Sequence, residues 1–129
     1  MWSRLVAVVH VLAGAACASG QGISVERSPF PEPPDSVLVE VVNDNFYDAR
    51  IHAVYDGGQR VSLGTIAGNG NRAEATIHWE PRPIRFEILF VIGGTAYVSY
   101  PVEVERGDVI EVRLPRNIDM SGFFRRVSR

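Results

Sequence analysis

The chain has 129 residues, of which 46% are hydrophobic, 22% charged and 9% aromatic, with 12 Gly, 8 Pro and one Cys. This length suits one domain, and the composition excludes wholesale disorder, a collagen-like repeat and a disulfide-stapled miniprotein. The 13 basic residues are all Arg and face 15 acidic ones, so the net charge is −2. Because an excess of positive charge is needed to hold a polyanion, this balance argues against nucleic-acid binding.

The first 17 residues have the pattern of a secretory signal peptide. One positive charge at Arg4 precedes an apolar run from Leu5 to Ala16 that only His10 interrupts. A run of about twelve residues is too short to cross a bilayer, which needs about 20. The small residues that close the run favour a cleavage site. We therefore expect export, with a buried N-terminal element of the domain as the alternative.

Cys17 directly follows a cluster of small residues, Gly14 to Ala16. This arrangement resembles the lipobox of bacterial lipoproteins, in which the cysteine becomes the first mature residue and carries a diacylglycerol. Those lipoproteins usually have Leu three residues before the cysteine, where this chain has Gly14. The resemblance implies a lipid anchor on Cys17 and, because Ala18 rather than Asp follows, a place at the outer membrane. The competing interpretation is cleavage after Ala18, which would make the protein periplasmic or secreted.

Residues 18–35 are rich first in Gly and Ser and then in Pro. Such a stretch is typical of a flexible and then extended tether, because proline fixes φ and lacks an amide donor. The alternative is that the prolines bind an aromatic groove of a partner. We place the signal peptide and lipobox-like region at 1–17, the tether at 18–35 and one folded domain at 36–129.

From Ser36 onward, residues alternate with the period of a β-strand. Pro101 predicts a sheet edge or a bulge, and glycine pairs such as Gly57-Gly58 mark turns. No convincing helical periodicity occurs after residue 35. With a last edge strand in the tail, the pattern predicts an all-β, mainly antiparallel β-sandwich of about seven strands. The other expected strands are 37–42, 49–55, 72–79, 84–92, 96–104 and 109–114.

The run Gly107 to Leu114, after an alternating segment that ends at Glu105, resembles the closing hairpin of carboxypeptidase-regulatory-like and transthyretin-like β-sandwich modules. The order of signal, lipobox, linker and one such immunoglobulin-like sandwich is similar to small bacterial lipoproteins. The resemblance implies a fold and a location in the cell envelope. It carries over no catalytic residue, because these modules are mostly accessory or adhesive.

Two aromatic segments supply the candidate contacts for a partner or ligand. Phe46 and Tyr47 lie in a turn, and His78 and Trp79 lie where the segment 72–79 ends. An exposed aromatic face suits a glycan or a peptide. The alternatives are that the turn aromatics fold back over one end of the sandwich, and that Trp79 lies in the core with the inward residues of its strand.

Asp44, Asn45 and Asp48 form the densest group of oxygen-bearing side chains and are the candidate calcium ligands. The segment lacks the glycine and the distal glutamate of an EF-hand loop, and Asx turns explain the same residues without an ion. His52 and His78 would suit zinc only if their strands were neighbours, and the spacing shows no cluster of three or four ligands. The sequence therefore predicts neither another metal site nor a cofactor.

No phosphate loop, GxSxG, HExxH, CxxC or GxGxxG motif occurs, so we expect no enzymatic activity. In the tail 123–129, Phe123, Phe124 and three arginines suit an edge strand or contact with anionic headgroups. The leading hypothesis is an envelope protein with a structural, adhesion or assembly role, anchored in the membrane and bound to an envelope partner. The alternative is a periplasmic or secreted binding or accessory module for a small ligand, glycan or metal.

Two structural features separate these hypotheses. A concave face with several aromatic and charged groups would favour ligand binding. A fully packed sandwich with one bare, charge-poor edge strand would favour a partner that adds a strand to the sheet. The sequence does not define the partner or the oligomeric state.

Overall fold

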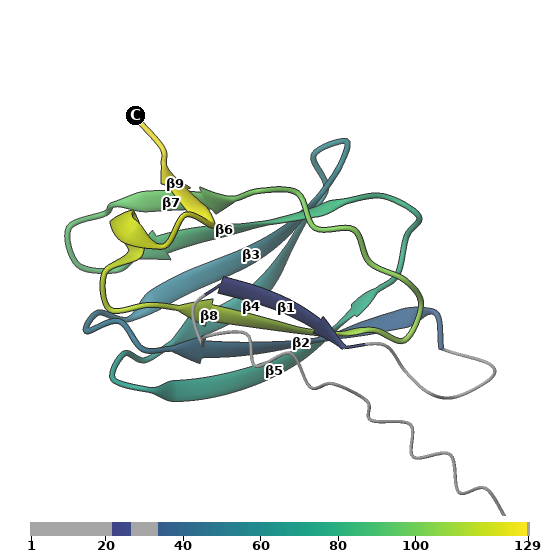
Figure 1. Ribbon diagram of the computed structural model, residues 1–129, viewed down its shortest axis with the longest axis horizontal. Helices are drawn as coiled ribbons and strands as arrows, with labels where there is room; N and C mark the ends of the chain where they lie inside the picture. The colour runs from purple at the N-terminus through teal and green to yellow at the C-terminus, as the bar shows by residue number, and fades with distance from the viewer. Residues whose placement is uncertain (1–21, 27–33, 129) are drawn as a thin grey trace, which may run out of the picture.

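The computed structural model describes residues 22–26 and 34–128 (Figure 1). In these ranges the chain is all-β, with nine strands and one 3-10 helix. The strands form two mainly antiparallel sheets, consistent with a β-sandwich. The fold class that the alternating pattern predicts is confirmed.

Each sheet combines strands that are distant in the chain. In the first sheet all neighbours are antiparallel except β2 and β8, which run parallel. Its spatial order is β1 (Gly22–Glu26), β8 (Val109–Leu114), β2 (Ser36–Asn43) and β5 (Asn71–His78). The second sheet has the order β4 (Arg60–Ile66), β3 (Ala49–Tyr55), β6 (Ile84–Phe90), β7 (Ala96–Ser99) and β9 (Phe124–Arg126). The 3-10 helix η1 (Ile118–Met120) precedes β9.

The core lies between the two sheets and is built by every second residue of the long strands. In β6, for example, Ile84, Phe86 and Ile88 are buried, whereas Arg85 between them is exposed. Ile110 of β8 is buried in the same cluster. Burying one side chain of this size contributes about 1.5–3 kcal/mol, so the alternating strands supply the main stabilisation of the fold.

β1 lies inside the segment that we predict as a tether. Its residues pair antiparallel with β8, from Gly22 opposite Arg113 to Glu26 opposite Val109. Most of β1 is exposed, so its sequence shows no clear hydrophobic alternation. Residues 22–26 therefore belong to the folded domain and not to the tether. The rest of the predicted tether up to residue 33, and the predicted signal peptide with Cys17, lie outside the described residues.

Two further strands differ from the sequence prediction. The sequence pattern does not predict β4. A register shift opposite Ile51 and His52, with Gly64 at a φ of 97°, breaks the alternation of inward and outward residues in this strand. β7 ends at Ser99 and not at residue 104, because Pro101 interrupts the segment; Val102 makes only an isolated bridge to Ile84. The expected last edge strand is confirmed as β9.

Candidate interaction surfaces

The loops gather at two opposite ends of the sandwich (Figure 1). The end on the left of Figure 1 is called the apolar end here, and it carries loops 44–48, 67–70, 91–95 and 115–120. The opposite end is called the charged end, and it carries loops 56–59, 79–83 and 105–108.

Large hydrophobic side chains are exposed at the apolar end. Phe46 is 73% exposed, Ile92 68% and Met120 80%, and each comes from a different loop. Tyr47 and Val91 beside them are also exposed. Scattered exposed hydrophobic residues are ordinary, whereas several on one surface indicate an interaction site.

The two turn aromatics behave differently. The ring of Tyr47 lies 6.4 Å from that of Phe90, edge to face, so it covers the end of the core. Phe46 contacts Tyr47 at 5.4 Å between ring centroids but stays mostly in solvent. Folding back over the sandwich therefore describes Tyr47, while Phe46 remains available for contact.

Asn43, which is fully buried, holds the loop that presents Phe46. Its amide nitrogen donates to the carbonyl oxygens of Tyr47 at 2.9 Å and Ile66 at 3.0 Å. Its amide oxygen accepts from the backbone N–H of Asn45 at 3.1 Å, which is an Asx turn. The loop is therefore fixed from inside by a residue that contacts no solvent.

Asn45 ties the same loop to the segment after β8. Its amide nitrogen donates to the carbonyl oxygens of Pro115 and Arg116, both at 3.1 Å. Its amide oxygen accepts from the backbone N–H of Tyr47 at 3.1 Å. Asn45 therefore acts through contacts about 70 residues away in the chain, which no local sequence pattern could reveal.

The candidate calcium ligands have protein partners. Asp44 pairs with Arg113 at 2.8 Å, and this bond raises the pKa of the Arg113 guanidinium. Asp48 accepts from the backbone N–H of Gly68 at 3.0 Å, while Asn45 makes the bonds given above. Among the described residues there is no group of three or more His, Cys, Asp or Glu side chains placed to hold a metal ion. These contacts favour the Asx-turn interpretation of the segment.

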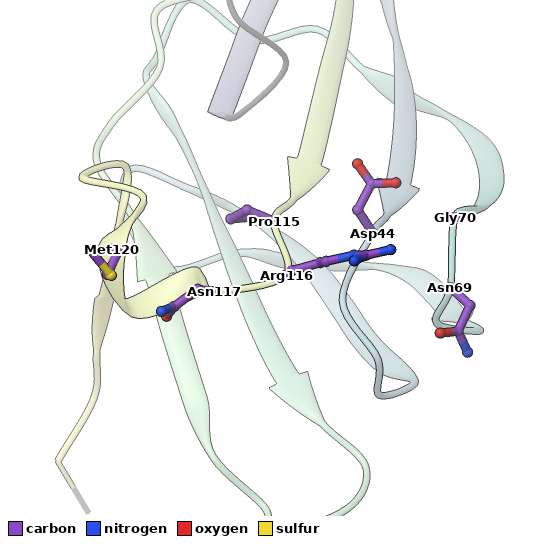
Figure 2. Close-up of a pocket in the computed structure, with 7 residues that line it drawn as sticks. All are labelled: Asp44, Asn69, Gly70, Pro115, Arg116, Asn117 and Met120. Carbon is purple, nitrogen blue, oxygen red and sulfur yellow. The ribbon is translucent and has the colours of Figure 1, made fainter.

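A pocket of about 710 Å³ also opens at the apolar end (Figure 2). Figure 2 shows Arg116 extending towards Asp44, while Met120 lies on the opposite side of the pocket. The lining contains charged and amide groups but no aromatic ring, so it lacks the stacking surface of a typical glycan site. It is formed by Asp44, Asn69, Gly70, Pro115, Arg116, Asn117 and Met120.

At the charged end, Trp79 is half-buried and packs against the core. Its indole N–H donates to the carbonyl oxygen of Val104 at 3.1 Å. The guanidinium of Arg106 lies 4.8 Å from the ring centroid and also pairs with Asp35 at 2.8 Å. The protein itself therefore covers the indole, whereas the neighbouring His78 is exposed.

The two histidines of the domain lie in different sheets. His52 belongs to β3 in the second sheet, opposite Glu87 of β6. His78 belongs to β5 in the first sheet, opposite Ser36. Because the strands are not neighbours, the condition for a shared zinc site is not met.

Four described strands form the edges of the sheets, and three of them are blunted. β1 has five residues, β9 has three, and β4 contains the register shift. β5 instead has eight residues in continuous register with β2. A long regular edge presents a row of main-chain donors and acceptors to another chain.

The pairing with β2 shows which groups of β5 face outward. The backbone N–H of Trp79 donates to Asp35. Because hydrogen-bonded pairs alternate in an antiparallel ladder, the odd-numbered residues of β5 bond to β2 and the even-numbered ones point away. The outward main-chain groups at the middle of the edge are those of Arg72, Glu74 and Thr76.

A row of three glutamates crosses the outer face of the first sheet. Glu40 in β2 lies directly opposite Glu111 of β8 on one side and Glu74 of β5 on the other. Like charges in directly opposite positions destabilise a sheet. Arg113 offsets part of this repulsion by bonding Glu111 at 3.1 Å. The sequence could not reveal the row, because it depends on three strands that are far apart in the chain.

No protein-family profile matches the chain, and a search of curated proteins finds no significant match. In the described part of the chain, no helix has the length and apolar character needed to cross a bilayer. The surfaces at the apolar end and along β5 are therefore the features that point to a function.

Proposed function

We propose that this chain is an exported, lipid-anchored β-sandwich of the bacterial cell envelope with an adhesion or assembly role. In this proposal the domain resembles carboxypeptidase-regulatory-like and transthyretin-like modules, has no enzymatic activity, and binds a partner protein that adds a strand to β5. The observation that carries the proposal is the long, regular outer edge of β5. The envelope location is supported by the signal-like residues 1–17 and by Cys17.

The chemistry of β5 supports strand addition. An incoming strand would bond to the outward N–H and carbonyl groups of Arg72, Glu74 and Thr76. The inward residues Ala73 and Ala75 are small and half-buried, so side chains of the partner would find apolar surface beside them. The strand contains no proline, no register shift and no inward charge, which are three of the features that protect an edge. Its two charged residues, Arg72 and Glu74, have opposite signs and are exposed on the outer face.

The alternative role, a module for a small ligand, glycan or metal, has less support. The pocket at the apolar end has no aromatic lining. The indole of Trp79 is covered by Arg106. We therefore favour a protein partner over a small ligand.

Site-specific photo-crosslinking in cells tests the strand-addition proposal. A photoreactive residue replaces Thr76 in β5 or, as the matched control, the equally exposed Thr65 in the edge strand β4. We expect a discrete protein adduct from position 76 only. The adduct should disappear in Glu74→Pro, because this proline blocks an outward N–H without removing a bond to β2. No adduct from position 76, or the same adduct from both positions, would contradict strand addition.

Labelling with a radioactive or clickable lipid precursor tests the anchor separately. The proposal expects label on the wild type and none on Cys17→Ser, with loss of membrane retention in the variant. An unlabelled wild type, or a Cys17→Ser variant that stays in the membrane fraction, would contradict anchoring through this cysteine.

A further inference from the structure

We infer that the apolar end of the sandwich rests on the lipid bilayer, with Phe46, Ile92 and Met120 inserted between the lipid headgroups. The inference rests on the proposed anchor at Cys17. It goes beyond that anchor because it assigns a second contact with lipid and fixes which end of the domain faces the bilayer.

The first observation is where the folded domain begins. β1 starts at Gly22, so only residues 18–21 separate it from Cys17. These few residues span at most about 18 Å even when fully extended. Gly22 lies opposite Arg113, one residue before β8 ends, and Figure 1 shows that β1 begins at the apolar end. An anchor on Cys17 therefore holds this end close to the bilayer.

The opposite end is held much further away. A strand of eight residues such as β2 is about 27 Å long. The charged end lies at the other end of the strands from Gly22, so the short link does not bring it to the anchor. Its loops at 56–59, 79–83 and 105–108 contain no exposed large hydrophobic side chain among their described residues. Of the two ends, only the apolar end combines proximity to Cys17 with exposed large hydrophobic side chains. A less exposed group, Val25, Tyr100 and Phe123, lines a separate pocket beside β1.

The second observation is the chemistry of the inserted groups. Among the described residues, Phe46, Ile92 and Met120 are the most exposed of the large hydrophobic side chains, and they lie on three separate loops of one end. Moving such side chains from water to the boundary between headgroups and acyl chains is favourable. Three contact points on separate loops can define an orientation, which one flexible lipid chain cannot.

Charged side chains of both signs surround this end. Arg116 and Arg72 are exposed there, one in loop 115–120 and the other near the start of β5. Asp48 and Asp119 are also exposed, and Asp44 is paired with Arg113. The charges therefore show no excess of either sign, and the exposed hydrophobic side chains carry the contact with lipid.

The loop that carries Phe46 is also preorganised. Asn43 and Asn45 hold it through bonds to Ile66, Pro115 and Arg116. A loop that is already fixed loses little conformational freedom when it docks. The exposed ring is therefore a built feature of the turn.

Fluorescence quenching by brominated lipids tests this inference. The lipidated chain is reconstituted into vesicles of phosphatidylcholine and phosphatidylglycerol whose acyl chains carry bromine. Ile92→Trp places a reporter at the apolar end, and Gln59→Trp places the matched control at the exposed turn of the charged end. After subtraction of the parent signal from Trp79, we expect quenching to be severalfold stronger at position 92 than at position 59. Quenching at both positions, at neither, or only at position 59 would overturn the inference.

Two further arms separate docking from anchoring. If Cys17 carries no lipid, the same two variants are mixed as unlipidated chains with the anionic vesicles. Quenching at position 92 alone would then support docking of the apolar end even though the anchor has failed. No quenching at position 92 would overturn the docking inference as well. If Cys17 is lipidated but position 92 is not quenched, the anchor stands and the docking inference fails.

A last arm distinguishes lipid from a second copy of the chain. Shielding of position 92 from aqueous acrylamide in vesicle-free solution, increasing with protein concentration, would assign the surface to self-association and overturn the inference. Combined replacement of Phe46, Ile92 and Met120 by serine should remove quenching of a reporter placed at Val91. Unchanged quenching in that variant would contradict insertion of the three side chains.

Discussion

The two ends of this sandwich differ in whether the chain covers their most prominent aromatic side chain. At the apolar end, buried amides hold the turns from inside while Phe46 points into solvent. At the charged end, Trp79 packs against the core and Arg106 lies over its ring. The chain therefore covers the ring of Trp79 at the charged end but leaves the ring of Phe46 uncovered at the apolar end. The exposure of Phe46 is a property of this end and not of the whole domain.

The difference also concerns how each end is stabilised. Buried hydrogen bonds of Asn43 and Asn45 are insensitive to salt, whereas the pair Arg106–Asp35 at the charged end is exposed and screened. The charged end also has one buried loop contact, since Asp108 accepts from the backbone N–H of Glu105 at 2.8 Å. The apolar end is the one whose buried contacts join loops that are distant in the chain. A rigid end that presents hydrophobic groups is suited to docking on a preformed surface.

Removing the buried amide of the apolar end should have the largest effect on stability. Asn43→Ala deletes the bonds to Tyr47, Ile66 and Asn45 and leaves buried carbonyl groups without their donor. We expect a loss of about 3 kcal/mol in the free energy of unfolding. Urea denaturation followed by circular dichroism measures it. A loss below about 1 kcal/mol would contradict the view that buried amides hold this end.

Gly68→Ala should have the next largest effect. A Cβ at this position would lie 2.4 Å from the carbonyl oxygen of Phe46 and 2.7 Å from that of Asn45, so the backbone must move. We expect a loss of about 2 kcal/mol. Gly93→Ala is the control in the same end, because its Cβ meets open space and only its φ of 84° is strained. Thermal melts should show a larger loss of stability for Gly68→Ala than for Gly93→Ala. Equal losses would contradict the close approach at Gly68.

At the charged end, Arg106→Ala should lower stability by less than about 1 kcal/mol, because an exposed ion pair is largely screened by solvent. The variant exposes one face of the Trp79 indole to water, so the fluorescence emission of Trp79 should shift to longer wavelength. The small loss should shrink further in high salt. A loss as large as that of Asn43→Ala would erase the proposed difference between the ends.

Phe46→Ser should have the smallest effect on folding. The side chain is 73% exposed, so we expect the free energy of unfolding to change by no more than about 0.5 kcal/mol. Binding of the unlipidated chain to anionic vesicles should nevertheless weaken. Flotation in a density gradient measures the binding, and unchanged flotation would argue against a role of Phe46 in docking.

The parts of the fold that the sequence predicts are those in which one residue in two faces the core. β6 is such a case, with Ile84, Phe86 and Ile88 on one side. β1 and β4 escape prediction because the first is mostly exposed and the second contains a register shift. Their strand structure depends on pairing with β8 and β3, which a local pattern does not encode.

The surfaces are less predictable than the strands, for a related reason. The turn at 43–48 could be predicted as a set of Asx turns, but the bonds from Asn45 to Pro115 and Arg116 could not. Those distant bonds fix the loop that presents Phe46. Likewise, the alternation of β5 is visible in the sequence, but its place at the edge depends on the order of all four strands of the first sheet.

We infer that the apolar end faces the bilayer and that the charged end faces away from it. Hydrogen–deuterium exchange of the lipidated chain in anionic vesicles, compared with Cys17→Ser in solution, tests it most directly. We predict slower exchange on the membrane for the amides of loops 44–48 and 91–95, with unchanged exchange in loops 56–59 and 105–108. Slower exchange in the loops of the charged end, or no change in either set, would contradict the claim.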